Sequence, residues 1–162
     1  MLKSIHQTVL FLLAVSVLVL PGCTKSDKPD GFPDIFPCEI KVLQDGSPLA
    51  GASVTLMGDQ PWAVGGGTDD SGVAKIFTHG KYEGAPVGKY KILVSKRIVE
   101  GAPTQEQLND PSFTGGGETQ YNVVDKKFGV QATTTLEIEV SSGKNSETVD
   151  VGKAVREALP KL

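Results

Sequence analysis

Few residues of this chain have the chemistry that a catalytic or metal site requires. The sequence contains two histidines, His6 and His79, and two cysteines, Cys23 and Cys38. His6 lies within residues 1–22, which are predicted below to be removed as a signal peptide, and one histidine with one free thiol is too small a set for a typical zinc site. A Ser-His-Asp triad would have to use His79, which stands beside Gly80 in a predicted turn, so a surface histidine is the simpler interpretation. We therefore predict no catalytic residue, no metal site and no cofactor.

Two other stretches have a superficial likeness to ligand sites. Asp69 and Asp70 are adjacent carboxylates, but the wider spacing of oxygen ligands in a calcium loop is missing, and both fit a hairpin turn. Gly84 and Gly88 precede Lys89 in a way that superficially resembles a phosphate-binding loop. However, no Ser or Thr follows this lysine, and the segment leads into a strand pattern where a phosphate loop opens a helix. Neither stretch is predicted to bind a ligand.

The N-terminus has the most specific pattern in the chain. After Lys3, a largely apolar run of twelve residues extends from Val9 to Leu20. Because a membrane-spanning helix needs about 20 residues, this run is typical of a signal peptide. The next residues, Leu20-Pro21-Gly22-Cys23, resemble the bacterial lipobox. That resemblance implies removal of residues 1–22 and attachment of diacylglycerol and an acyl chain such as palmitate to Cys23. The alternative is an ordinary cleaved signal that leaves Cys23 as a plain thiol.

The segment after the predicted cleavage site indicates a tether and an envelope location. Residues 23–37 contain three prolines and alternating charges, which favour a semi-extended linker of about 3.1 Å per residue. Thr24 is not the aspartate that retains some lipoproteins at an inner membrane, so a periplasmic or outer-membrane face is expected. The chain has a net charge of −3, which argues against a nucleic-acid partner. The expected partners are the membrane, through the lipid, and envelope proteins or glycans.

Strand patterns begin at residue 38. The segment from Asp45 to Leu56 indicates a tight turn that feeds an alternating strand, and the same period of two occurs in the segments that contain Ile40, Ile92 and Ile138. For Val73 to Phe77 either face could be buried. About seven such segments with turns between them predict an all-β fold, a single antiparallel β-sandwich over residues 38–152. A short helix is expected at Lys153 to Leu159, within a C-terminal tail of residues 153–162.

Three motifs occur in the order found in a known family: Asp45 to Leu56, Thr68 to Ala74 and Gly84 to Val94. Together they resemble the carboxypeptidase regulatory-like family, and within it the short single-domain bacterial lipoproteins. The resemblance covers about residues 38–151 and implies a transthyretin-like sandwich in an extracytoplasmic setting. The segment 97–123 and the predicted C-terminal helix are departures from the family pattern. A fold of this kind does not imply a particular chemistry.

These patterns favour a lipid-anchored, non-catalytic module of the cell envelope that binds a partner or has a structural role. The alternative is a small extracytoplasmic hydrolase that uses residues of the long loops. Two Gly-rich segments, 58–72 and 97–123, carry Trp62 and Tyr121. Because binding residues often lie on loops held by a rigid scaffold, we expect both aromatic residues in one contact surface. For Trp62 the competing expectation is that it folds back over the open edge of the sandwich.

Overall fold

A computed structural model describes residues 28–29, 31–115 and 117–160. The chain divides into two parts, Met1–Phe32 and Pro33–Leu162. In the first part the described residues are few, and Phe32 donates its backbone N–H to the carbonyl of Pro29 at 3.1 Å. The predicted signal peptide, Cys23 and the start of the tether lie outside the described residues. The fold below is that of the second part.

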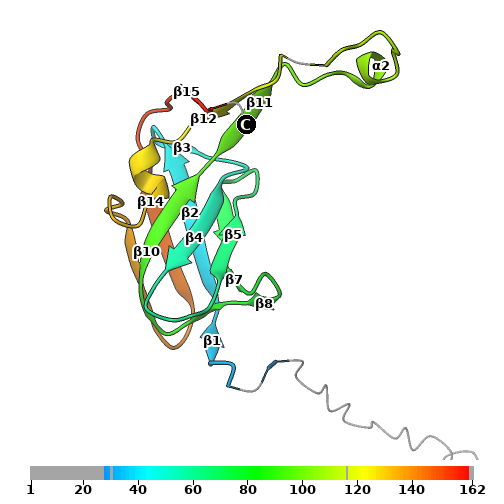
Figure 1. The fold of residues 1–162 in the computed structure, drawn as a ribbon. Coiled ribbons are helices and arrows are strands. Elements are labelled where there is room, and N and C mark those ends of the chain that lie inside the picture. Colours follow the sequence, from blue (N-terminus) through cyan, green and yellow to red (C-terminus); the bar gives the residue numbers. More distant parts are fainter. Residues whose placement is uncertain (1–27, 30, 116, 161–162) are drawn as a thin grey trace, which may run out of the picture. The chain divides into compact units, whose positions relative to one another are not determined.

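The larger sheet of this domain contains β10, β4 and β5, which lie side by side in Figure 1. Its strand order is β13-β10-β4-β5-β7-β8, and all neighbours are antiparallel. The strands are β4 (Ser53–Met57), β5 (Val64–Gly67), β7 (Phe77–Thr78), β8 (Tyr82–Glu83), β10 (Gly88–Ser95) and β13 (Glu137–Val140). The clearest alternating segments of the sequence thus form its middle and one edge.

The second sheet is built on β2 (Cys38–Gln44). It pairs with β3 (Ser47–Pro48), β6 (Val73–Lys75) and β14 (Asn145–Asp150). The β2–β14 pair is parallel, so the prediction of a purely antiparallel fold is wrong here. A short connection between two strands normally indicates an antiparallel hairpin. Here the turn after Val140 instead carries the chain from the larger sheet to the second one, where β14 lies beside β2.

Both sheets contribute side chains to a shared core. The buried residues alternate along β2, β4 and β10 as the sequence predicts, with Ile40 and Ile92 fully buried. The open question about Val73 to Phe77 is also decided, because Ala74 and Ile76 are 0% exposed. Each fully buried aliphatic side chain of this size contributes about 1.5–3 kcal/mol. The helices of the described residues are only α2 (Gln105–Leu108) and η1 (Lys126–Gly129), so the all-β prediction is confirmed.

A second short pair modifies the predicted tether. Strand β1 (Ile35–Phe36) pairs antiparallel with β9 (Ala85–Pro86). Residues 35–36, which the sequence assigns to the tether of residues 23–37, are therefore attached to the domain. The prolines at positions 33 and 37 flank this strand, and they made the whole stretch look like linker.

The turn before β6 has the geometry that its sequence predicts. One carboxylate oxygen of Asp69 accepts hydrogen bonds from the Ser71 hydroxyl at 2.7 Å and from the backbone N–H groups of Ser71 and Val73, each at 2.9 Å. These hydrogen bonds, that of the Ser71 hydroxyl foremost, lower the pKa of Asp69. Gly72 closes the turn with a φ of +76°, in the left-handed region that favours glycine. The two aspartates therefore lie in a hairpin turn, as expected.

The glycine triplet at residues 65–67 is not the loop that we expected. It forms strand β5 between β4 and β7. A Cβ atom on Gly66 would lie 2.1 Å from the carbonyl oxygen of Lys75, and one on Gly65 would lie 2.5 Å from that of Val54. Glycine is required here because backbones approach each other too closely for a side chain. Because glycine is also common in turns, the sequence pattern predicted a loop where the structure has a strand in close contact with its neighbours.

The segment 97–123 is also more ordered than predicted. Strands β11 (Arg97–Glu100) and β12 (Thr119–Asn122) form an antiparallel ribbon, and α2 lies in the connection that joins them (Figure 1). A third strand, β15 (Glu157–Ala158), comes from the C-terminal tail and pairs with β12. The predicted helix at Lys153 to Leu159 is therefore wrong. A helix this short is marginal in water, whereas the open edge of β12 offers backbone partners such as the carbonyl of Gln120, 2.8 Å from the N–H of Leu159.

Candidate functional site

A shallow trough lies over β4, β5 and β7 of the larger sheet. Its volume is about 550 Å³, within the range of roughly 300–1,000 Å³ that is common for small-molecule sites. None of the described residues that line it carries a charge. The trough is lined by Ser53 to Met57, Trp62 to Gly67, Phe77 and Gly80.

The floor of the trough follows from the strand pattern. Along β4, Val54 and Leu56 are buried in the core, while Ser53, Thr55 and Met57 lie on the opposite face. On the same face, the β5 residues opposite Thr55 and Ser53 are Gly65 and Gly67, so no side chain projects from the sheet there. The result is a depression bounded by side chains on the neighbouring strands.

Gly67 differs from the two glycines before it. Gly65 and Gly66 are required by close backbone contacts, but a Cβ atom on Gly67 would meet nothing closer than the carbonyl oxygen of Ala52, at 3.8 Å. Gly67 also lies outside the left-handed region of φ. Packing therefore does not explain glycine at this exposed strand position, where β-branched residues are usually preferred. The absence of a side chain at Gly67 keeps the trough open.

Trp62 forms one wall of the trough. It is half-buried and packs against the hydrophobic core, and its ring meets the His79 ring edge-on, with centroids 5.3 Å apart. The backbone N–H of His79 donates to the carbonyl of Ala63 at 2.7 Å, which joins the two segments. His79 itself is an exposed turn residue, as predicted. Trp62 thus packs back on the domain, and it also faces the trough.

Tyr121 lies at the other end of the domain. It is on β12 between Ile98 and Ala158, and the Arg156 guanidinium is 4.3 Å from its ring centroid. Arg156 also forms an ion pair with Glu100.

The strand registers exclude a surface shared by Trp62 and Tyr121. In the β4–β10 pair, Ser53 is opposite Ser95 and Met57 is opposite Lys91. The segment with Trp62 therefore follows β4 near the start of β10, whereas the ribbon with Tyr121 begins after the end of β10 (Figure 1). The expectation of one contact surface is wrong, because Trp62 lies near the start of β10 whereas Tyr121 lies on the ribbon that begins after the end of β10.

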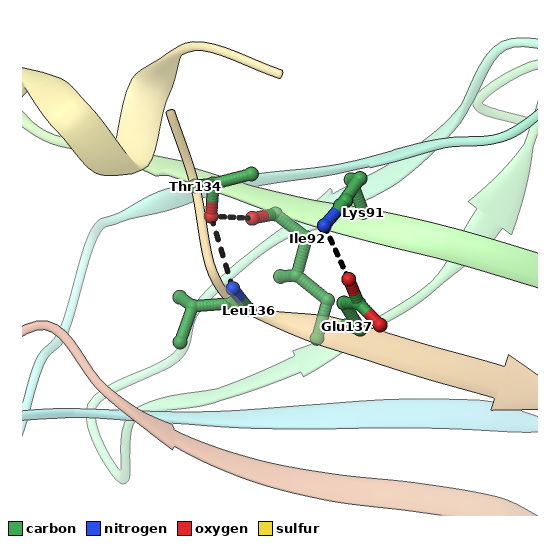
Figure 2. A network of polar contacts seen from close by, with 5 residues as sticks. All are labelled: Lys91, Ile92, Thr134, Leu136 and Glu137. Atoms are coloured by element: carbon green, nitrogen blue, oxygen red, sulfur yellow. Dashed lines mark hydrogen bonds and ion pairs between the residues drawn. The ribbon is translucent and has the colours of Figure 1, made fainter. Parts of the chain in front are cut away.

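A second groove, also of about 550 Å³, lies over β13, β10 and the end of β4, and it is charged. Its lining includes Lys89, Lys91, Glu137 and Glu139. Figure 2 shows the ion pair between Lys91 and Glu137, which joins β10 to β13. Beside it, the Thr134 hydroxyl donates to the carbonyl of Ile92 at 2.9 Å and accepts from the N–H of Leu136 at 3.3 Å. These contacts attach the edge strand to the sheet, so a structural role accounts for them.

The Lys91–Glu137 pair predicts a pH dependence of stability. The hydrogen bond and charge of Lys91 lower the pKa of Glu137 below its ordinary value of 4.5. Because the pKa is lowered on folding, the pair stabilises the domain above pH 4.5, and this contribution is lost as the pH falls through the folded-state value. We expect Glu137→Gln to lower the melting temperature at neutral pH and to match wild type in strong acid. Thermal melts across this range test it, with Glu139→Gln on the same strand as control. A deficit that persists in strong acid would contradict the assignment.

The other metal-binding and nucleophilic side chains of the described residues do not form a metal site or an activated thiol. No group of three or more His, Cys, Asp or Glu residues within this part of the chain could hold a metal ion. Cys38 is buried, and desolvation raises the pKa of its thiol to about 11. A thiol with so high a pKa stays protonated at neutral pH and is a poor nucleophile. It packs as a small apolar residue in the core cluster that also contains Ile40.

The described residues define an all-β domain with an uncharged trough on one sheet face. No family model matches the chain, and no curated protein or solved structure matches it either. Within the described residues, no helix is long and apolar enough to cross a membrane. The resemblance to the carboxypeptidase regulatory-like family therefore remains an expectation.

Proposed function

We propose that this protein is a lipid-anchored, non-catalytic binding module of the bacterial cell envelope. The trough beside Trp62 is the observation that carries the binding role, because it combines a ligand-sized volume with an aromatic wall and a floor that has no outward side chains along β5. Cys23, directly after the apolar run and Gly22, is the proposed site of lipid attachment. The tether then separates the domain from the membrane surface.

A transthyretin-like β-sandwich is the proposed scaffold. The core shared by β2 of one sheet with β4 and β10 of the other supports this architecture. In such an arrangement the outer face of the larger sheet is available to a partner while the inner face holds the domain together. Ligands bound on that outer face would contact Trp62, whereas Tyr121 is a separate candidate contact on the ribbon.

Site-specific crosslinking in the native host tests the binding role. A photoreactive amino acid at Met57, which lines both the trough and the end of the charged groove and is 39% exposed, should capture a defined envelope component, and Gly67→Val then shows whether the trough holds it. The matched control places the same group at Val99, which is 48% exposed. Val99 lies on β11, in a different sheet from the strands that line the trough. A product that depends on position 57 and disappears in Gly67→Val supports the proposal. Equal products from both positions, or none from either, would contradict it.

Catalysis would require a different conclusion. The alternative hydrolase would use residues of the long loops, and His79 is the one histidine among the described residues. A substrate screen with the purified protein, repeated with His79→Ala, separates the two functions. Turnover that is abolished by this substitution would favour the hydrolase and overturn the non-catalytic proposal.

A further inference from the structure

The lining of the trough indicates the charge of its ligand. The neighbouring groove over β10 and β13 is lined by lysines and glutamates, but the described lining of the trough contains none. A carboxylate, phosphate or ammonium ligand would lose its hydration without gaining a charged partner, which is unfavourable. The trough therefore fits an uncharged ligand.

The position of the trough in the sheet indicates how that ligand is held. Strand β4 pairs with β10 and β5, and β5 pairs with β4 and β7. Strand β4 is paired on both sides and β5 has β7 beside it at Val64 and Gly65, so an extended peptide has no free strand edge to join at this place. Recognition must come from side chains on the sheet face. Those side chains are the rings of Trp62 and Phe77 and the hydroxyls of Ser53 and Thr55.

Aromatic rings and nearby hydroxyls match the surface of a sugar ring. A pyranose has an apolar C–H face that packs on an aromatic side chain, and its rim of hydroxyls exchanges hydrogen bonds with Ser and Thr. The open floor at Gly67 leaves room for the ring to approach the sheet. We propose that the trough binds an uncharged saccharide, with Trp62 as the stacking wall and Thr55 as a hydrogen-bonding group. This inference rests on the proposed binding function and specifies its ligand class.

Trp62 is the single tryptophan of the sequence, so its fluorescence reports directly on the trough. The test uses the full-length, lipid-anchored protein in a detergent without a sugar headgroup. The probes are maltotriose, cellotriose and the trimer of N-acetylglucosamine, and a sialylated trisaccharide is the charged control. We expect a saturable change in fluorescence with at least one neutral probe and none with the charged control.

Variants assign this signal to the trough. Gly67→Val should remove binding while the melting temperature stays at or above that of wild type, because valine suits an open strand position. By calorimetry, Trp62→Ala should weaken binding at least about tenfold, and Trp62→Phe should restore part of it. Tyr121→Ala on the ribbon should bind as wild type does. If Gly67→Val lowers the melting temperature, the Trp62→Ala and Trp62→Phe pair decides the outcome.

Three results would overturn the saccharide inference. The first is that no neutral probe gives a response at millimolar concentration. The second is that Gly67→Val and Trp62→Ala both bind as well as wild type. The third is that an apolar peptide binds more strongly than the saccharides. A protein captured from position 57 by crosslinking, and lost in Gly67→Val, would leave the binding module in place and exclude the saccharide. Equal crosslinks from positions 57 and 99 would instead remove the binding module itself.

Discussion

Gly66→Val should destabilise the domain severely, by about 3 kcal/mol or more, because added side-chain atoms would collide with backbone. The first of these atoms, Cβ, would lie 2.1 Å from the carbonyl oxygen of Lys75 and 3.1 Å from its carbonyl carbon. A carbonyl in a strand cannot move aside as the end of a flexible side chain can. Relief would require β5 to separate from the chain between β6 and β7, at the expense of the core around Ile76.

Urea unfolding of the full-length protein measures this loss, and the neighbouring glycine provides the control. Gly67→Val adds the same side chain one residue later on β5, where the nearest atom lies 3.8 Å away. We expect the unfolding midpoint to fall sharply for Gly66→Val and to change little for Gly67→Val. Equal midpoints for the two variants would show that β5 does not approach the Lys75 backbone as described.

Cys23→Ser should move the protein from the membrane fraction to the soluble fraction. Each buried CH₂ group of an acyl chain contributes about 0.8 kcal/mol to membrane binding, so loss of several chains at once removes the anchor. Serine has a hydroxyl where the lipobox reaction requires a thiol. The same variant should therefore lose labelling by a fatty-acid probe.

Cys38→Ala is the matched control for the anchor, because it removes the other cysteine of the chain. Cys38 is 3% exposed and lies in the core, so this variant should keep both the label and the membrane fraction. If Cys23→Ser keeps its label and its membrane partition, the anchor assignment is wrong. If the wild-type protein is soluble and carries no fatty-acid label, the N-terminus is an ordinary cleaved signal and Cys23 is a plain thiol.

Strand prediction succeeded where a side-chain pattern repeats along the chain. Ile92 and Val94 alternate with polar neighbours, and they are buried on β10 in the way that a period of two requires. It failed at the glycine triplet, because glycine has no side chain from which a buried face can be read. It also failed at the C-terminus, where Glu157 and Ala158 form β15 and pair with β12, although the segment has weak helical character.

The candidate site could be predicted only in part. Trp62 was identified as a candidate contact, because it is an aromatic residue in a segment expected to be a loop, and binding residues often lie on loops. Thr55 and Gly67 had no such signal, since one is an ordinary outward-facing strand residue and the other belongs to a triplet that resembles a turn. Their significance depends on a strand register that brings Thr55 opposite Gly65 and Ser53 opposite Gly67.

The sequence by itself determined that the segments around Ile40, Ile92 and Ile138 are strands, which of their faces are apolar, and where the Asp69 turn closes, because these properties depend on residues close together in the chain. Only the tertiary structure decided that β14 runs parallel to β2, that the tail completes the ribbon, and that Trp62 and Tyr121 lie at opposite ends. The trough was decided at the same level. It exists because the pairing of β4 with β5 places Gly65 and Gly67, which have no side chains, beside Thr55 and Ser53 on the outer face of the sheet, and this register joins segments that are separate in the chain.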